Sequence, residues 1–277
     1  MTYSFKNKIA LVTGGASGYG EAAVRRFVSK GFVFIHFLRI VGTTDKLEYS
    51  TKVVIVDLNE KLGAALVAEL NKNNSSSSPT AVFGKADVTS EEDMRAVFDL
   101  AVKTFGRVDI VLNNAGVAEL SRFDEDPKGM WRKVIDIDLT AVILGTVLAT
   151  EYMHKTGGGV VINTASAAGL MPLPVAPIYT AAKHGVIGFT TALRPLLRTK
   201  KVRVNAIAPF FSPTPLVTGN RDANSAFDRI VGSTPLTPVS SVVDGIFTAI
   251  ENEDLVARVV MISPKGVKVL PPVSAKL

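Results

Sequence analysis

The sequence predicts a doubly wound α/β fold with a parallel sheet. Short apolar runs alternate along the chain with segments of helical periodicity, which is the pattern of repeated βαβ units. Hydrophobic residues make up 47% of the 277 residues, a share that suits a sheet buried on both faces. This length fits one large α/β domain, so we expect residues 1–277 to form a single domain.

The first part of the chain is expected to supply four buried strands, at residues 9–12, 53–57, 82–86 and 109–112. Helical spacing predicts helices at 21–30, 61–70 and 90–105. Ser90 with three acidic residues directly after it is a helix-start signal, and Gly31 is a stop signal. The serine-rich stretch 73–79 is expected to be a loop.

The second part continues the alternation. We expect a long helix at 130–153, a strand at 159–163, a helix from Tyr179, a strand at 202–207, a helix at 241–252 and a last strand at 259–262. Pro195 should end or kink the helix near Arg194, because proline has no N–H to donate. The proline-rich stretch 209–238 is expected to be a loop that crosses the active site.

Composition excludes several classes of site. The chain has no cysteine, which rules out disulfides, thiolate metal sites and cysteine nucleophiles. The three histidines, His36, His154 and His184, lack metal-ligand spacing, so we expect no metal. The net charge of +6 is scattered without a basic stripe, which argues against nucleic-acid binding.

No membrane-spanning segment is expected. The most apolar early stretch, 32–41, is about half the length of a span and contains His36 and Arg39. The first residues lack the apolar core of a signal peptide. These features predict a cytoplasmic protein.

A glycine-rich turn follows the first predicted strand. Residues 13–20 read Thr-Gly-Gly-Ala-Ser-Gly-Tyr-Gly and lead into the first helix. Glycines let backbone N–H groups approach a pyrophosphate, and the helix N-terminus adds a partial positive charge. The strand and helix on either side are the context that such a site requires, so we expect a dinucleotide to bind here.

Tyr179 and Lys183 stand at positions i and i+4, on one face of a predicted helix. A free phenol has a pKa near 10 and is a poor base at neutral pH. A nearby ammonium favours the phenolate, so we expect Lys183 to lower the pKa of Tyr179.

These motifs together resemble the short-chain dehydrogenase/reductase family. The glycine spacing Thr-Gly-x-x-x-Gly-x-Gly, the Asn113-Asn114-Ala115-Gly116 motif, Ser166 and the Tyr179-x-x-x-Lys183 pair occur in the family's order. The resemblance covers about residues 8–268 and implies a Rossmann fold. It also implies an enzyme that interconverts a secondary alcohol and a ketone by hydride transfer with NAD or NADP.

The resemblance assigns roles to individual residues. Ser166 would hold the substrate oxygen, Tyr179 would be the general acid/base, and Lys183 would hold the nicotinamide ribose and tune Tyr179. The implied cofactor-binding residues are Gly14, Ser17, Gly18, Tyr19, Gly20, Asp57, Leu58, Asp87, Val88, Asn114, Ala115, Gly116, Tyr179, Lys183, Pro209 and Thr214.

Two positions depart from the family pattern. Asp138 stands where the family has an asparagine that bends the helix and anchors a water of the proton relay, and an ionised aspartate cannot donate hydrogen bonds. We include Asp138 in the predicted catalytic set, at the position of the family asparagine. Phe210 follows Pro209 where the family has glycine, and we expect it to crowd the nicotinamide.

The choice of cofactor depends on which segment is the second strand. An acidic residue about 20 residues beyond the glycines would bind the adenosine ribose and select NAD. Asp57 lies farther along, because about 32–51 resembles an insertion. If 53–57 is the second strand, the cofactor is NAD, the interpretation we favour. If 32–38 replaces it, Arg39 ends the strand and favours NADP. We hypothesise that the insertion is translated intron, which sequencing of the transcript would test.

The substrate is expected to be a small apolar or lipid-like alcohol or ketone, because apolar residues would line the site's lip: Leu170, Met171, Leu173, Val175, Phe210, Phe211 and Leu216. The alternative is a catalytically weak, nucleotide-binding family member that acts as a subunit or scaffold. The resemblance also implies a homodimer or homotetramer.

Overall fold

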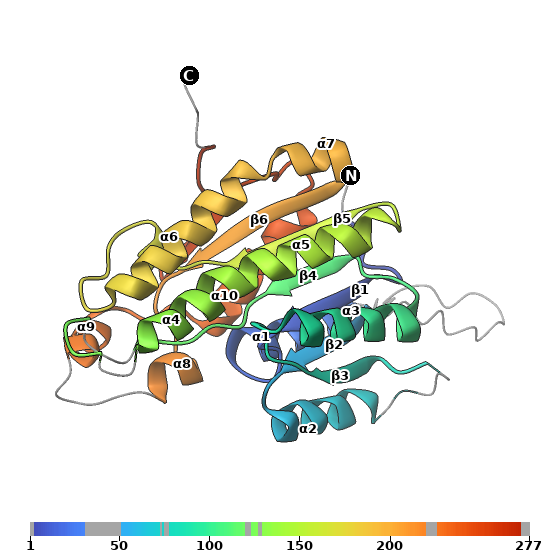
Figure 1. Cartoon of the computed structure of the whole chain (residues 1–277), viewed down its shortest axis with the longest axis horizontal. Helices are drawn as coiled ribbons and strands as arrows, with labels where there is room; N and C mark the ends of the chain where they lie inside the picture. The colour runs from blue at the N-terminus through green and yellow to red at the C-terminus, as the bar shows by residue number, and fades with distance from the viewer. Residues whose placement is uncertain are drawn as a thin grey trace, which may run out of the picture.

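The computed structural model describes residues 3–30, 51–72, 74, 78–119, 123–126, 129–219 and 226–272. They form one sheet of eight strands in the order β3-β2-β1-β4-β5-β6-β7-β8 (Figure 1). Neighbouring strands run parallel except β7 and β8. The predicted doubly wound parallel fold is confirmed.

The strands are β1 (Ile9–Thr13), β2 (Lys52–Asp57), β3 (Ala81–Lys85), β4 (Ile110–Asn113), β5 (Gly159–Thr164), β6 (Val202–Pro209), β7 (Val259–Ser263) and β8 (Gly266–Val269). The helices are α1 (Gly18–Lys30), α2 (Glu60–Asn71), α3 (Glu91–Phe105), α4 (Met130–Ile135), α5 (Ala141–His154), α6 (Pro177–Ala192), α7 (Pro195–Lys200), α8 (Pro215–Thr218), α9 (Ala226–Ser233) and α10 (Val239–Glu251).

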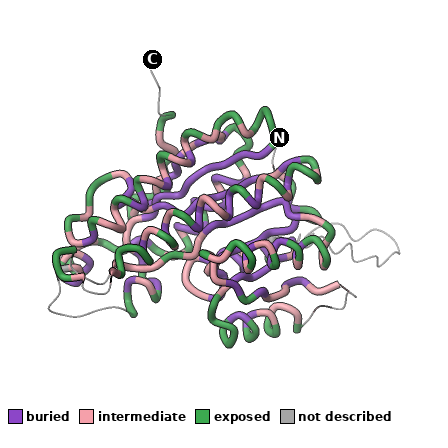
Figure 2. Tube along the Cα trace, in the orientation of Figure 1, coloured by how far each residue is buried: buried purple, intermediate pink, exposed green. Residues whose placement is uncertain are grey.

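Helices cover both faces of the sheet. Buried side chains of α1, α2 and α10 share one apolar cluster with the sheet, and those of α3 and α5 share another on the opposite face. The central strands β1 and β4 are buried along their whole length (Figure 2). This double coverage explains why the strands read as continuous apolar runs without alternation.

Residues 52–57 are the second strand of the sheet. β1 pairs with β2 on one side, from Ile9 opposite Lys52 to Thr13 opposite Val56, and with β4 on the other. The alternative that residues 32–38 replace this strand is therefore wrong, and Asp57 rather than Arg39 ends it. The inserted segment lies outside the described residues, except Thr51.

The long predicted helix 130–153 contains a wide turn. Residues Asp136–Thr140 are π-helical and join α4 to α5. Such a π-bulge bends a helix locally and occurs often at functional sites. Pro195 separates α6 from α7, as the sequence predicted. The antiparallel edge strand β8 and the short helices α8 and α9 were not predicted.

The strand order reverses between β1 and β4. Chain connections lead from β1 outward through β2 to β3, and then return to β4 on the other side of β1. Ligands of open α/β sheets bind at such a switch point, at the carboxyl ends of the strands. The fold therefore places the candidate site where Thr13 and Asn113 end their strands.

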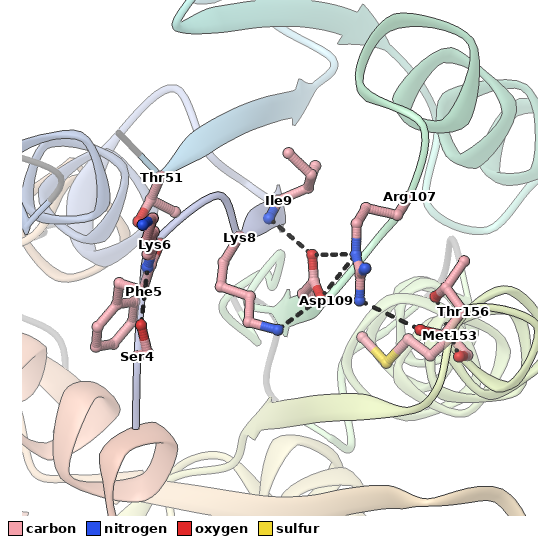
Figure 3. Close-up of polar contacts among 10 residues, drawn as sticks. All are labelled: Ser4, Phe5, Lys6, Lys8, Ile9, Thr51, Arg107, Asp109, Met153 and Thr156. Carbon is pink, nitrogen blue, oxygen red and sulfur yellow. Dashed lines mark hydrogen bonds and ion pairs between the residues drawn. The ribbon is translucent and has the colours of Figure 1, made fainter. Parts of the chain in front are cut away.

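A charged cluster joins the same two strands at the opposite edge (Figure 3). Asp109 is 1% exposed and accepts hydrogen bonds from Lys8 Nζ at 3.1 Å and from the N–H of Ile9 at 3.1 Å. Arg107 Nη2 donates to the same carboxylate at 2.6 Å. The cluster links the starts of β1 and β4.

We expect Asp109→Ala to lower the free energy of unfolding by about 2 kcal/mol, because it removes charge-assisted hydrogen bonds to a buried acceptor. Urea denaturation measures the change. The control is Glu60→Ala, which breaks an exposed ion pair with Lys85 and should cost below about 1 kcal/mol. Equal losses in the two variants would contradict the role given to Asp109.

Candidate active site

A cavity of about 520 Å³ opens at the carboxyl ends of the central strands. This volume is ordinary for a small-molecule site. Its walls come from segments that follow β1, β4, β5 and β6, and from α8 and α9. Part of the stretch 209–238 thus lies over the cavity, where the sequence placed the substrate loop.

The glycine turn can adopt its path only without side chains. Gly14 and Gly18 have positive φ angles of 61° and 56°. A Cβ on Gly14 would lie 2.9 Å from the Cα of Ala115, and one on Gly20 would lie 2.0 Å from the carbonyl oxygen of Gly14. The turn leaves the start of α1 facing the cavity, which fits a dinucleotide phosphate.

Thr13 and Asn114 tie this turn to the loop after β4. Thr13 Oγ1 accepts from the N–H groups of Asn114 at 2.9 Å and Ala115 at 3.1 Å. Asn114 Nδ2 donates in return to the carbonyl oxygens of Thr13 at 3.2 Å and Gly14 at 3.3 Å. The two loops therefore form one rigid cradle.

The predicted cofactor residues occupy two zones. Eleven of these residues line the cavity, from the turn, the β4 loop, α6 and the segment at and after the end of β6: Gly14, Ser17, Gly18, Tyr19, Asn114, Ala115, Gly116, Tyr179, Lys183, Pro209 and Thr214. The others do not line it: Gly20 lies in α1, and Asp57, Leu58, Asp87 and Val88 follow β2 and β3 along the same sheet edge.

Asp57 lies directly against the glycine turn. Its Oδ2 accepts from the N–H of Ala16 at 3.1 Å, and its Oδ1 accepts from the N–H of Asn59 at 2.9 Å. Leu58 next to it is 60% exposed, although it is apolar. An exposed apolar side chain and a fixed carboxylate at this edge suit an adenosine group.

Ser166, Tyr179 and Lys183 converge on the cavity. Ser166 follows β5, and its Oγ accepts from the N–H of Ala168 at 3.1 Å. Lys183 is 3% exposed, donates to the carbonyl oxygen of Thr164 at 3.1 Å, and lies with Nζ 5.4 Å from the centre of the Tyr179 ring. The structure thus brings the three predicted catalytic side chains together.

Asp138 is fully buried and pairs directly with Lys183. Its Oδ1 lies 3.3 Å from Lys183 Nζ and accepts from the N–H of Val117 at 3.2 Å. Its Oδ2 is buried without a hydrogen-bond partner among the described residues. Burial raises the pKa of Asp138, and the positive charge of Lys183 opposes this effect.

Lys183 acts on the pKa of Tyr179 in the expected direction, but two other effects oppose it. Burial raises the pKa of the Tyr179 phenol, and the Asp138 carboxylate raises it further. Lys183 and a hydrogen bond with Ser166 favour the phenolate, as expected, but they do not outweigh burial. The expected effect of Lys183 on the Tyr179 pKa is therefore present, but burial makes the net shift upward. Burial opposes the charge on Lys183, yet Asp138 and Tyr179 hold its pKa above the ordinary value.

Sequence reasoning missed Glu119 and the α9 side chains that line the cavity. Glu119 Oε2 accepts from the N–H of Tyr179 at 2.8 Å. Phe227 and Ile230 of α9 face the same cavity. No spacing rule identifies Glu119, because it meets α6 only through the fold. Phe210 also lines the cavity, and its N–H donates to the carbonyl oxygen of Ile262 at 2.9 Å.

The comparisons agree with this geometry. A sequence model described as short chain dehydrogenase matches residues 43–225, more than half of the chain. The chain is 32% identical to 15-hydroxyprostaglandin dehydrogenase [NAD(+)] of Bos taurus over 94% of this chain and 92% of that protein. It is 34% identical to cyclohexanol dehydrogenase of Acinetobacter sp. (strain SE19) over 80% of each chain.

A solved structure shows the same fold. The crystal structure of 3-ketoacyl-(acyl-carrier-protein) reductase from Brucella melitensis, complexed with NADH, superposes with a TM-score of 0.76 at 25% identity. The match covers 94% of this chain and 98% of that one. The chain belongs to the short-chain dehydrogenase family, and it is an oxidoreductase that acts on CH–OH groups with a nicotinamide cofactor.

Within the described ranges, no helix is both long and apolar enough to cross a membrane. Among the same residues, no group of histidine and acidic side chains could hold a metal ion.

Proposed function

We propose that the protein interconverts a secondary alcohol and a ketone with NAD, and that its substrate is apolar. The observation that carries the proposal is the convergence of Ser166, Tyr179 and Lys183 in one cavity with the glycine turn. Bound NAD would supply the hydride acceptor for the alcohol, and NADH the hydride donor for the ketone. The chain's own residues would position the substrate and move its proton.

Tyr179 is the general acid/base of the proposal. In the oxidation, its phenolate takes the proton of the substrate hydroxyl, and the carbon that bears this hydroxyl would give its hydride to bound NAD. Ser166 holds the substrate oxygen beside the phenol. Lys183 holds the ribose of the cofactor, and its charge favours the phenolate, as its effect on the Tyr179 pKa supports.

Asp57 favours NAD over NADP. Its carboxylate ends β2 beside the glycine turn, where it can accept from the hydroxyls of the adenosine ribose. A phosphate on that ribose would meet the negative charge. The name of the bovine relative, which specifies NAD(+), supports the same choice.

An apolar substrate fits the lining of the cavity. The side chains around the catalytic set are mostly apolar, including Met171, Leu173, Phe210, Phe211, Leu216, Phe227 and Ile230. Phe211 and Phe227 pack edge to face with ring centres 5.7 Å apart, and they fix one wall. Apolar walls with a few polar groups are typical of sites that bind small apolar ligands.

The second candidate function is a nucleotide-binding subunit with little catalysis. The direct pairing of Lys183 with Asp138 favours it, because the pair leaves one buried carboxylate oxygen unsatisfied and makes the Tyr179 phenolate harder to form. We propose a homodimer or homotetramer for either function. Exposed Trp131 and Val147 on α4 and α5 support such an assembly. The cytoplasmic location stays a prediction.

Tyr179→Phe separates the two functions. The enzyme should lose about a hundredfold or more in kcat, because the proton-transfer group is gone, and should keep its affinity for NADH. Steady-state assays and fluorescence titration measure the two quantities. Tyr152→Phe removes a phenol hydroxyl that bonds Asp99 outside the cavity, and it should leave kcat unchanged. Equal turnover of wild type and Tyr179→Phe would contradict the mechanism.

Asp138→Asn should shift the pH profile of alcohol oxidation to lower pH. The aspartate raises the pKa of Tyr179, so its neutral replacement lets the phenolate form at a lower pH. The measurement is kcat/KM against pH, with Asp99→Asn as a control that removes a carboxylate charge from α3. A profile that stays in place or moves to higher pH would contradict this account of Asp138.

A further inference from the structure

Among the described residues that line the cavity, one acidic side chain has no basic partner. Three of the cavity's described lining residues have a carboxyl or amino side chain: Glu119, Asp138 and Lys183. Asp138 and Lys183 neutralise each other at 3.3 Å. Glu119 forms no ion pair among the described residues. Its carboxylate therefore gives the described lining of the cavity a net negative charge.

Glu119 is held at the start of the catalytic helix. Its Oε2 accepts from the N–H of Tyr179 at 2.8 Å, in the first turn of the 16-residue helix α6. The helix dipole and the free N–H groups of this turn favour a negative group there. Burial raises the pKa of Glu119, while hydrogen bonds from the N–H groups of Tyr179 and Ile178 oppose the rise. The fold thus fixes an acidic side chain beside the catalytic tyrosine.

The described lining offers no unpaired basic side chain for a second carboxylate. The loop segments before Glu119 and before α6 contribute apolar residues to it, namely Ala118, Met171, Leu173 and Ala176. Lys183 is the lone basic side chain of that lining, and it is already paired with Asp138. A substrate carboxylate in this space would lose its water, find no cation, and lie near a like charge.

We propose that Glu119 is a specificity-determining residue, which restricts the site to uncharged apolar alcohols and ketones and excludes those that carry a carboxylate. The inference rests on the proposed function, since it names the substrate class of the same site. The proposed substrate class differs from that of the prostaglandin dehydrogenase, because prostaglandins are carboxylic acids. It is closer to that of the cyclohexanol dehydrogenase, because cyclohexanol carries no charge.

The test uses matched pairs of secondary alcohols that differ only in a carboxylate. One pair is cyclohexanol and hydroxycyclohexanecarboxylate, and the other is a linear secondary octanol and its terminal carboxylate analogue. The readout is kcat/KM with NAD for wild type, Glu119→Gln and Glu69→Gln. The last variant removes the same charge from α2, outside the cavity. NADH titration of each variant checks that the cofactor site is intact.

Wild type should prefer the uncharged member of a pair by about tenfold or more, as expected for two like charges several ångströms apart near a protein surface. Glu119→Gln should reduce this preference about tenfold, because it removes the negative charge while its amide oxygen can still accept from the N–H of Tyr179. Glu69→Gln should keep the wild-type preference.

Equal or greater kcat/KM for the carboxylate member in wild type would overturn the inference and leave the proposed function standing. An unchanged preference in Glu119→Gln would overturn the role of Glu119 in the same way. If NADH binds but no alcohol or ketone of either kind is turned over, the proposed function fails, and the inference fails with it.

Discussion

The hydroxyl of Thr13 holds together the two loops on which the site depends. Thr13 is the last residue of β1. Its hydroxyl oxygen accepts hydrogen bonds from two backbone N–H groups of the loop after β4, across the point where the strand order reverses. That loop then continues to Gly116, where a Cβ would lie 2.6 Å from Asp138 Oδ1 and 3.8 Å from Lys183 Nζ. Close contacts thus connect the glycine turn with α6, so the turn and Lys183 share one rigid frame.

The buried charge of Asp138 is energetically unfavourable within this frame. A buried ion pair gains little when each charge must leave water, and here one carboxylate oxygen also lacks a partner. The π-helical turn between α4 and α5 turns this residue toward Lys183. The chain therefore pairs Lys183, the proposed catalytic lysine, with a carboxylate, where the family pattern has a neutral amide. The consequence falls on Tyr179, whose phenolate must form beside a net-neutral pair instead of a free ammonium.

Much of the fold follows from local patterns, because strands buried on both faces must be apolar throughout. Residues 53–57 show this: their apolar run and the helical spacing after them identified the second strand despite the preceding insertion. The edge strand β8 could not be predicted, because Gly266–Val269 is largely exposed and has no apolar run. The catalytic side chains could be named from motifs, whereas Glu119 could not, since its contact with α6 depends on tertiary packing. The net direction of the Tyr179 pKa shift could not be predicted from the sequence either. The i, i+4 spacing identifies the nearby Lys183 ammonium, but it does not show that the phenol is buried.

The account rests on β2 ending at Asp57 beside the glycine turn, and the competitive binding of NADH and NADPH tests that placement most directly. Fluorescence titration of the purified protein with each nucleotide measures the two dissociation constants. The account predicts tighter binding of NADH, because the Asp57 carboxylate would accept from the ribose hydroxyls and repel an added phosphate. Tighter binding of NADPH, or binding of neither nucleotide, would contradict it.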